Sequence, residues 1–396
     1  MPGKYAAAAK GNRHLYLWFL RNCRGFIKAL VHARSSRQYS LMKLMLIEQF
    51  LPVLNPVYLS IFVLFMAISS CLSQPTVSEG TDVFAQNRLL GRGVNVLGYD
   101  PIWDSFDQGR FKERCFKMIH DGGFDTLRVD LFPFRHMGAA PDFVLSNSWW
   151  QTAEWVVTNA LAANLNVILD FHEYEIMAKD AEGNKARFLA FWRQLAPHFQ
   201  NAPDKVMFEI LNEPNHEMTP EIWNQYLAEA LTIIRASNPI RSVIIGPAFY
   251  NSIDHLNELK LPEKDHNLIV TVHYYNPMDF THQGAAWAGR KDKLGVVWQG
   301  TPEERAAIVA DFQKAQNWAK RHHRPIFLGE FGAYDKGDMA SRVRWTECVA
   351  RSAEKCGWSW AYWQFDSDFI VYDIPKDQWV EPIHNALIPP AGAKTP

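Results

Sequence analysis

The sequence predicts an α/β fold, a (β/α)8 TIM barrel preceded by an N-terminal export segment and a linker. Three observations support this prediction. Short apolar runs alternate with amphipathic stretches over residues 88–390. Most of the runs lack the polar alternation of half-exposed strands, as expected for parallel strands covered on both faces. Several of them end in polar side chains, and the carboxyl ends of the strands form the catalytic face of such a barrel. A chain of 396 residues can hold one such domain with additions at its ends.

The expected elements alternate strictly along the chain. The strands are expected at 93–97, 126–130, 166–171, 206–211, 242–246, 268–274, 326–329 and 359–363. The amphipathic helices are expected at 110–120, 149–163, 185–199, 220–236, 302–321 and 339–355. Eight strands in this order favour a closed barrel over a doubly wound open sheet. The open sheet would need a glycine-rich phosphate loop after the first strand, and the glycines of Gly91-Arg-Gly-Val-Asn-Val-Leu-Gly98 have a different spacing.

The first part of the chain is expected to lie outside the fold. In residues 1–71, a basic extension is followed by an apolar run at 57–68 and the small residues Ser69 and Ser70, a pattern typical of export signals. The apolar run is short for a membrane-spanning helix. Ile68-Ser-Ser-Cys71 resembles a bacterial lipobox, so lipidation of Cys71, cleavage nearby and retention as an uncleaved anchor are three alternatives. We therefore expect an exported protein, whether secreted, periplasmic or attached to the outer membrane as a lipoprotein.

Two further boundaries follow from composition. Residues 1–40 are basic and aperiodic, and we expect them to be an upstream extension, with Met42 as the true start of translation. Residues 72–87 are expected to form a polar linker. The catalytic domain is expected at 88–390.

Charge and cysteine content narrow the possible functions. Residues 1–70 contain nine Lys/Arg and one acidic residue, a net charge of +8, which leaves 32 basic and 41 acidic residues, or −9, in the rest. An acidic body gives no reason to expect nucleic-acid binding, and a neutral polymer is a compatible substrate. The five cysteines form no metal-binding cluster in the sequence. Buried free thiols are favoured over a disulfide between Cys348 and Cys356.

Polar residues at the ends of six predicted strands form the candidate site. Each of them alone has an ordinary structural explanation, but their common position at one barrel face indicates a site. They are Arg128, His172, Asn212, Glu213, His273, Tyr275, Glu330 and Trp363.

Two glutamates in this set predict the chemistry. Glu213 and Glu330 follow strands four and seven, so they can face each other across the cleft. Such a pair suits cleavage of a glycosidic bond, with retention at a separation of about 5–5.5 Å and inversion at a wider one. Glu213 as general acid needs a raised pKa, and Glu330 must stay ionised. Arg128 and Tyr275 are candidates to stabilise the Glu330 carboxylate.

The remaining candidates are expected to bind the sugar. Asn212 is placed to contact the 2-hydroxyl group. His172 and His273 are expected to orient hydroxyl groups or to hold the carboxylates. Trp363 offers a flat surface for stacking. Outside this set, the expected stacking residues are Trp103, Trp149, Trp150, Trp287 and Trp298, with burial in the core as the alternative for each.

In combination, these residues resemble glycoside hydrolase family 5, the cellulase family. Phe208-Glu-Ile-Leu-Asn-Glu-Pro-Asn215 is similar to its acid/base motif, and Leu328-Gly-Glu-Phe-Gly332 to its nucleophile motif. All eight positions of the set that the family shares are filled, and the resemblance extends over residues 88–389. It implies a retaining mechanism with Glu213 as acid/base and Glu330 as nucleophile, and neither a metal nor a cofactor.

Two segments of the sequence bear on which polysaccharide is the substrate. Many relatives carry His, Asn or Asp after the position of His172, whereas this chain has Glu173, followed by Tyr174 and Glu175. The loop at 275–287, which ends in Trp287, resembles that of endoglucanase-like members and favours a β-1,4-glucan. We therefore expect an endo-β-1,4-glucanase that acts on a polysaccharide and meets a membrane only through its N-terminus. A β-mannanase or another β-glucanase is the enzymatic alternative, and a non-catalytic glycan-binding barrel is the alternative from another class.

Overall fold

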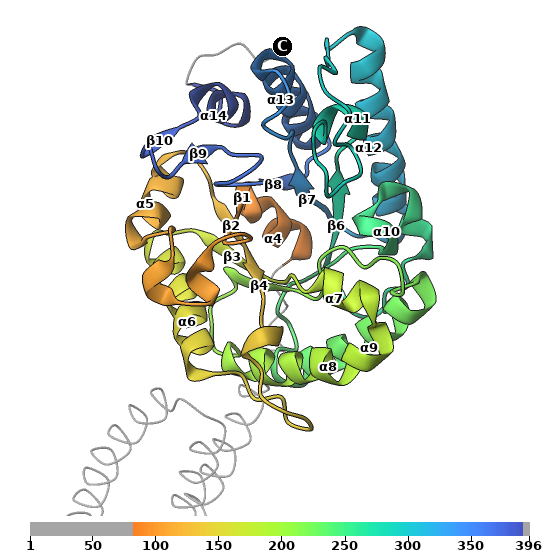
Figure 1. Cartoon of the computed structure of the whole chain (residues 1–396). Helices are drawn as coiled ribbons and strands as arrows, with labels where there is room; N and C mark the ends of the chain where they lie inside the picture. The colour runs from red at the N-terminus through yellow and green to blue at the C-terminus, as the bar shows by residue number, and fades with distance from the viewer. Residues whose placement is uncertain (1–81, 391–396) are drawn as a thin grey trace, which may run out of the picture. The chain divides into compact units, whose positions relative to one another are not determined.

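The computed structural model describes residues 82–390, and its centre is a closed barrel of eight parallel strands (Figure 1). The strands follow one another in chain order, and β8 pairs with β1 to close the ring. They are β1 (Arg92–Val96), β2 (Thr126–Leu131), β3 (Asn166–Phe171), β4 (Val206–Glu209), β5 (Val243–Ile245), β6 (Leu268–Tyr274), β7 (Ile326–Phe331) and β8 (Ser359–Tyr362). The predicted (β/α)8 barrel is confirmed, and all eight strands lie where the apolar runs placed them.

Helices surround the barrel, as the ring in Figure 1 shows. The long ones are α5 (Glu113–Asp121), α6 (Asn147–Ala162), α8 (Ala181–His198), α9 (Pro220–Ser237), α12 (Pro302–His322) and α13 (Met339–Lys355). All six match predicted helices, with ends that shift by up to four residues. Helix α8 begins earlier than predicted because the Asp180 side chain accepts a hydrogen bond from the Gly183 N–H and caps the helix there.

Shorter elements fill the connections. They are the α-helices α7 (Tyr174–Lys179), α11 (Met278–Thr281) and α14 (Glu381–Leu387), with the 3-10 helices η2 (Pro101–Trp103), η3 (Phe106–Gln108), η4 (Phe134–His136) and η5 (Ile253–Glu258). The segment labelled α10 (Ala248–Asn251) is a turn whose backbone departs from right-handed helical angles. A two-stranded hairpin of β9 (Tyr372–Asp373) and β10 (Gln378–Trp379) follows the barrel. Most of the short elements lie in loops that follow strands, where a TIM barrel builds its site.

Helix α4 (Val83–Leu90) closes the amino-terminal end of the barrel. Its backbone carbonyls at Leu90 and Leu89 accept hydrogen bonds from the first residues of β2 and β3. Val83 and Leu90 pack against inward side chains of six strands, namely Ile168, Met207, Ile244, Ile269, Phe327 and Ala361. Residues 83–87 therefore belong to the folded body, and the predicted end of the linker at residue 87 is wrong. The rest of the predicted linker and the export segment lie outside the described residues.

Four of the five tryptophans proposed for sugar stacking are part of the packing instead. Trp103, Trp149 and Trp298 are at most 3% exposed, and Trp103 stacks on Trp149 with ring centroids 5.7 Å apart. Trp150 stacks on His198 at 4.1 Å. The prediction is wrong for these four because the outer helices need large apolar side chains to cover the barrel. Trp287 is the exception, with 61% of its surface exposed.

Two other expectations concern the described part of the chain. Cys115, Cys348 and Cys356 are free thiols, and the first two are buried, so the preference for unpaired cysteines is confirmed for these three. Within residues 82–390, no helix combines the length and apolar character that a membrane crossing requires.

Candidate active site

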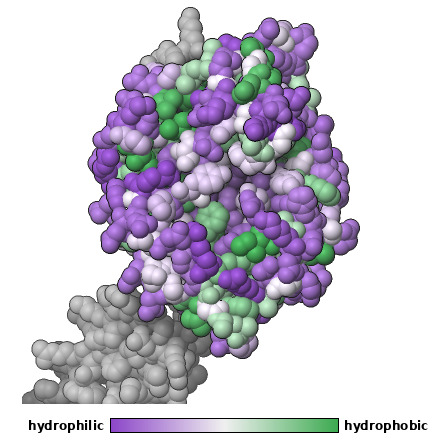
Figure 2. Space-filling view, viewed as in Figure 1, coloured by the Kyte–Doolittle hydropathy of each residue, from purple (hydrophilic) through white to green (hydrophobic). Residues whose placement is uncertain are grey.

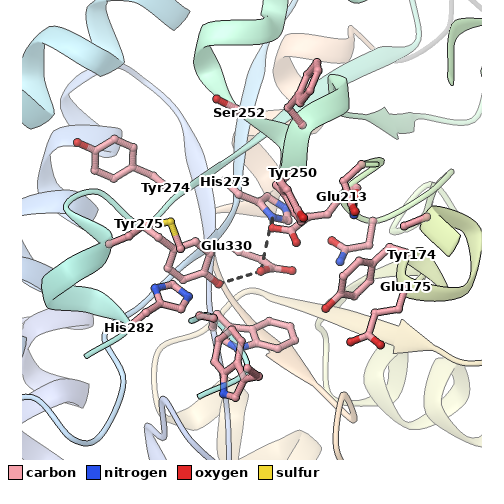
Figure 3. A pocket seen from close by; sticks show the side chains of 18 of the residues that line it. Tyr174, Glu175, Glu213, Tyr250, Ser252, His273, Tyr274, Tyr275, His282 and Glu330 are labelled. Atoms are coloured by element: carbon pink, nitrogen blue, oxygen red, sulfur yellow. Dashed lines mark hydrogen bonds and ion pairs between the residues drawn. The ribbon is translucent and has the colours of Figure 1, made fainter. Parts of the chain in front are cut away.

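A cleft of about 780 Å³ opens at the carboxyl ends of the strands. Figure 2 shows a hollow near the middle of this face of the molecule, and Figure 3 shows the residues around it. Eight predicted site residues line the cleft, namely His172, Asn212, Glu213, His273, Tyr275, Trp287, Glu330 and Trp363. The structure thus brings together residues that are up to 191 positions apart in the sequence.

Arg128 differs from its predicted position at a strand end. It is the third residue of β2, it is fully buried, and its side chain lies inside the barrel beneath the cleft. Its guanidinium donates two hydrogen bonds to Glu209, at 2.7 and 2.8 Å. It also bonds Asn95 at 2.8 Å, Asn212 at 2.8 Å and Glu330 at 2.9 Å. The planar fork of an arginine fits such a set of fixed acceptors, so Arg128 ties β1, β4 and β7 together under the site.

Glu330 is held on both carboxylate oxygens. Oε1 accepts from Arg128, and Oε2 accepts from the Tyr275 hydroxyl at 2.8 Å (Figure 3). Arg128 and Tyr275, the two residues expected to stabilise this carboxylate, thus both contact it. Because both contacts favour the charged form, they stabilise Glu330 as a carboxylate at the cleft.

Glu213 lies in the loop that leaves β4. Its backbone has a positive φ of 41°, which turns its side chain out of the strand direction, and Asn215 Nδ2 donates to its carbonyl at 2.7 Å. Its Oε1 lies 2.7 Å from Nδ1 of His273. Its side chain is 15% exposed, which leaves the carboxyl group accessible from the cleft.

The surroundings give the two glutamates different protonation states. Burial, together with the negative charges of Asp170 and Glu209, raises the pKa of Glu213 to about 8, against the opposing effect of Arg128. Burial also raises the pKa of Glu330. Two neighbouring carboxylates do not both ionise readily. Since Glu330 alone receives hydrogen bonds from Arg128 and Tyr275, it takes the charge and Glu213 keeps the proton.

Two histidines are neutral and orient their neighbours. Burial lowers the pKa of His172 to about 3 and that of His273 to about 4. His172 Nδ1 lies 2.5 Å from Asp170 Oδ2, and its Nε2 lies 3.3 Å from Asn212 Nδ2. Because Asn212 Oδ1 accepts from Arg128, the orientation of the amide is fixed, and its second N–H can donate to a group bound in the cleft.

Aromatic rings form the walls of the cleft. Trp363 lies parallel to the His172 ring, at an interplanar angle of 7° and a centroid distance of 5.6 Å. Trp287 contacts His282 and Phe369, and 61% of its surface is exposed to solvent. Flat rings of this kind suit the apolar faces of sugars.

Within residues 82–390, two sets of side chains have ligand atoms close enough to surround an ion. They are Asp130, Asp170 and His172, and Glu213, His273 and Glu330. Arg128 lies 3.1 Å from Asp170 and 2.9 Å from Glu330, so its guanidinium already supplies a positive charge to each set. The donors thus fit an arginine-centred network, and no step of the chemistry below uses a metal.

Sequence reasoning missed the supporting layer of this site. Glu209 and Asn95, which bond Arg128, are inward residues within strands, and Asp170 supports His172 in the same way. In the sequence, each of these three residues is a polar residue within an apolar run, and this is the pattern by which it could have been found. Glu173 also has a structural role, because it is 6% exposed and accepts the Phe134 N–H at 2.6 Å. Glu175, by contrast, lines the cleft.

Comparison with known proteins decides the family. A family model described as cellulase (glycosyl hydrolase family 5) matches residues 91–368. The chain belongs to glycosyl hydrolase family 5. Structures of Cel5A from Thermotoga maritima in complex with cellobiose are 40% identical in sequence and have a TM-score of 0.74, covering 78% of this chain and 100% of theirs. A mannotriose complex of the same enzyme is 39% identical with the same TM-score and coverage.

Curated relatives in the family carry endoglucanase names. Endoglucanase H of Acetivibrio thermocellus is 29% identical over 79% of this chain, and endoglucanase B of Clostridium cellulovorans is 27% identical over 69%. The chain spans 34% of the length of the first relative and 64% of the second. The family 5 domain is thus the part that they share with this chain.

Proposed function

We propose that this protein is a retaining endo-β-1,4-glucanase that hydrolyses internal bonds of cellulose-type β-glucans. The observation that carries the proposal is the spacing of the two carboxyl groups. An oxygen of Glu213, an oxygen of Glu330 and a nitrogen of His273 lie within 4.8 Å of one another. Retaining enzymes have carboxyl groups about 5–5.5 Å apart, whereas inverting enzymes need a wider gap for a water molecule.

The reaction proceeds by double displacement. In the first step, a Glu330 oxygen attacks the anomeric carbon, the bond from that carbon to the leaving oxygen breaks, and Glu213 gives its proton to that oxygen. In the second step, Glu213 takes a proton from water, whose oxygen attacks the same carbon and releases Glu330. The contacts of Arg128 and Tyr275 hold Glu330 in its charged form before attack.

The shape of the cleft supports cleavage within a chain. In Figure 3 the two glutamates lie between Tyr275 and His282 on one side and Tyr174 and Glu175 on the other. Lining residues on both sides of the reacting centre give sugar units on both sides of the scissile bond a surface to bind. The names of the curated relatives support a β-1,4-glucan as the substrate.

Product analysis tests this proposal. The protein is expected to release short oligosaccharides from carboxymethyl cellulose and to lower its viscosity early in the reaction. Glu330→Ala should lose activity and regain it with azide, giving a glycosyl azide of inverted configuration, while Glu213→Ala should lose hydrolysis of the polymer. Wild-type turnover in either variant would contradict the assignment of that glutamate. Binding of a β-glucan by the wild-type protein without any hydrolysis would favour a glycan-binding barrel. Faster cleavage of mannan than of every glucan would favour a β-mannanase, a substrate class suggested by the mannotriose complex of the Thermotoga enzyme.

We also propose that the protein is exported, with membrane contact only through its N-terminus. The support is the sequence of residues 41–71, with basic residues, an apolar run and the lipobox-like Cys71. N-terminal sequencing and mass spectrometry of protein from the native cell should show processing near Cys71, with or without a lipid. Full-length protein that is confined to the cytosol would contradict the proposal.

A further inference from the structure

Three residues after β5 adopt an unusual backbone conformation next to the acid/base. Phe249, Tyr250 and Asn251 have φ values of 57°, 62° and 55°, in the left-handed region that residues with side chains rarely occupy. We call residues 249–251 the left-handed turn. Such a conformation persists only where the surrounding structure imposes it, and it is often found at functional sites.

The left-handed turn holds the loop that contains the acid/base. The backbone N–H of Tyr250 donates to the carbonyl of Pro214, the residue after Glu213, at 3.2 Å. The Tyr250 hydroxyl lies 3.0 Å from Nε2 of His216 in the same loop. The two contacts join the loop after β5 to the part of the β4 loop that directly follows Glu213.

Asn251 makes a third contact, through His273. Its side chain is fully buried, and its Nδ2 lies 3.2 Å from Nε2 of His273. On the opposite side of the imidazole, Nδ1 lies 2.7 Å from Oε1 of Glu213. Gly246 leaves room for the amide, because a Cβ at that position would lie 2.0 Å from Asn251 Oδ1. Asn251, His273 and Glu213 thus form one line of hydrogen bonds.

The chemistry of this line fixes the position of a proton. An amide N–H can donate to Nε2 only if that nitrogen carries no hydrogen, so the hydrogen of a neutral imidazole must be on Nδ1. The Nδ1–H then donates to Glu213 Oε1, and the acid proton of Glu213 must be on Oε2. A reversed amide would instead accept from Nε2–H and turn Nδ1 into an acceptor for the Glu213 proton.

We propose that Asn251 is a positioning residue that holds His273 in its Nδ1–H form and thereby places the acid proton of Glu213 on Oε2, available to the leaving group. The proposal rests on the retaining hydrolysis proposed above. It gives the left-handed turn a function, because that backbone directs the Asn251 amide at His273.

Other titratable groups surround His273 and Glu213 on several elements. The charges that act on their pKa values come from β2, β3, β4 and β7, and nearby phenols come from three loops. These groups are Arg128, Asp170, His172, Glu209, Glu330, Tyr174, Tyr250 and Tyr275. They remain the same in the variants below, so a changed pH profile can be assigned to the Asn251 contact.

Asn251→Asp is the isosteric test. A carboxylate only accepts, so it draws a hydrogen onto Nε2 and favours the imidazolium form of His273. The positive charge beside Glu213 then favours its carboxylate form and removes the acid proton. We expect kcat/KM for cellotetraose to fall by about 10- to 100-fold, which is no more than the lower end of the contribution of general acid catalysis, because part of the Glu213 population keeps its proton. The alkaline limb of the pH profile should move to lower pH by about one unit.

A substrate with a good leaving group distinguishes proton placement from general disruption. The 2,4-dinitrophenyl β-cellobioside needs no acid to depart, so its kcat/KM should change by less than about threefold if only the Glu213 proton is affected. Gly246→Ala, which forces the Asn251 amide away, should give the same selective loss. Ser252→Ala is the matched control, because Ser252 directly follows the left-handed turn and caps the next 3-10 helix. The ratio of the two substrates should stay at its wild-type value in this variant.

Nitrogen NMR of the wild-type protein shows directly which ring nitrogen of His273 carries the hydrogen. The expected spectrum shows a hydrogen on Nδ1 of His273 and none on Nε2 at neutral pH. A hydrogen on Nε2 would overturn the proposal, as would equal losses on both substrates in Asn251→Asp or an unchanged pH profile. If the wild-type protein cleaves neither substrate, the proposed hydrolysis fails, and the NMR measurement still decides the position of the proton.

Discussion

Replacing Glu209 by glutamine tests the network beneath the cleft. Glu209 is fully buried and accepts Nε and Nη2 of Arg128 at 2.7 and 2.8 Å. Glutamine has nearly the same shape, but its amide nitrogen would face a guanidinium N–H, so one of the two bonds is lost together with the negative charge.

The expected loss of stability follows from the remaining contacts. Removing one partner of a buried ion pair costs about 3–5 kcal/mol. Arg128 keeps Asp170 at 3.1 Å and Glu330 at 2.9 Å, so we expect the lower end of that range, about 3 kcal/mol. Urea unfolding at pH 7 measures the difference. Glu154→Gln is the matched control, because the Glu154 side chain is 53% exposed and its ion pair with His198 should contribute no more than about 1 kcal/mol.

The same variant should move both limbs of the pH profile to lower pH. The charge of Glu209 raises the pKa of Glu213, so the neutral amide lowers it from about 8, and the general acid loses its proton at lower pH. Arg128, no longer neutralised by Glu209, stabilises the Glu330 carboxylate more strongly and lowers its pKa. The measurement is kcat/KM against pH on a soluble glucan. An unchanged unfolding free energy, or an alkaline limb that stays in place, would refute the account of Arg128 given above.

Three other variants test separate parts of the site. Tyr275→Phe removes the hydroxyl that donates to Glu330 at 2.8 Å, so the pKa of Glu330 should rise and the acidic limb of kcat/KM should move to higher pH; an unmoved limb would contradict that contact. Trp287→Ala should lower kcat/KM for cellotetraose by about 2- to 12-fold, the equivalent of about 0.5–1.5 kcal/mol of ring stacking, with no loss of thermal stability because the ring is 61% exposed. Trp149→Ala should do the reverse, reducing the free energy of unfolding by about 3–5 kcal/mol while KM for cellotetraose stays constant; a raised KM would restore its role in sugar binding.

The fold could be predicted because apolar patterning decides it. The bounds of β3, β6 and α13 coincide with the predicted 166–171, 268–274 and 339–355. Helix α4 was missed although its ends carry recognisable signals. Asp82 accepts the Phe84 N–H at its start, and Gly91 ends it with a φ of 53°. Its apolar residues do not mark one buried face, because Gln86 and Asn87 are buried whereas Phe84 and Leu89 are exposed. The sequence pattern therefore does not reveal that this segment covers the end of a barrel.

The sequence allowed prediction of the site residues at the strand ends, but not of the residues within the strands that support them. Residues such as Glu213 and Tyr275 follow apolar runs, so the sequence itself marks the strand ends. Glu209 and Asn95 lie within strands, where alternation decides whether a side chain points into the barrel or toward the helices, and short runs do not show which. Asn251 could not be found in this way, because its contact with His273 depends on three consecutive left-handed residues that follow no sequence rule for residues other than glycine.

The barrel interior also explains why the acid keeps its proton. Arg128 carries one positive charge, yet four buried carboxyl groups lie within 4 Å of its nitrogens, namely Asp130, Asp170, Glu209 and Glu330. One guanidinium cannot neutralise all of them, so some must hold protons at neutral pH. Burial raises the pKa of Asp130, and raises that of Asp170 to about 7. Every negative charge that does remain in this layer opposes ionisation of Glu213, so the alkaline limit of activity depends on the barrel interior as well as on the catalytic residue.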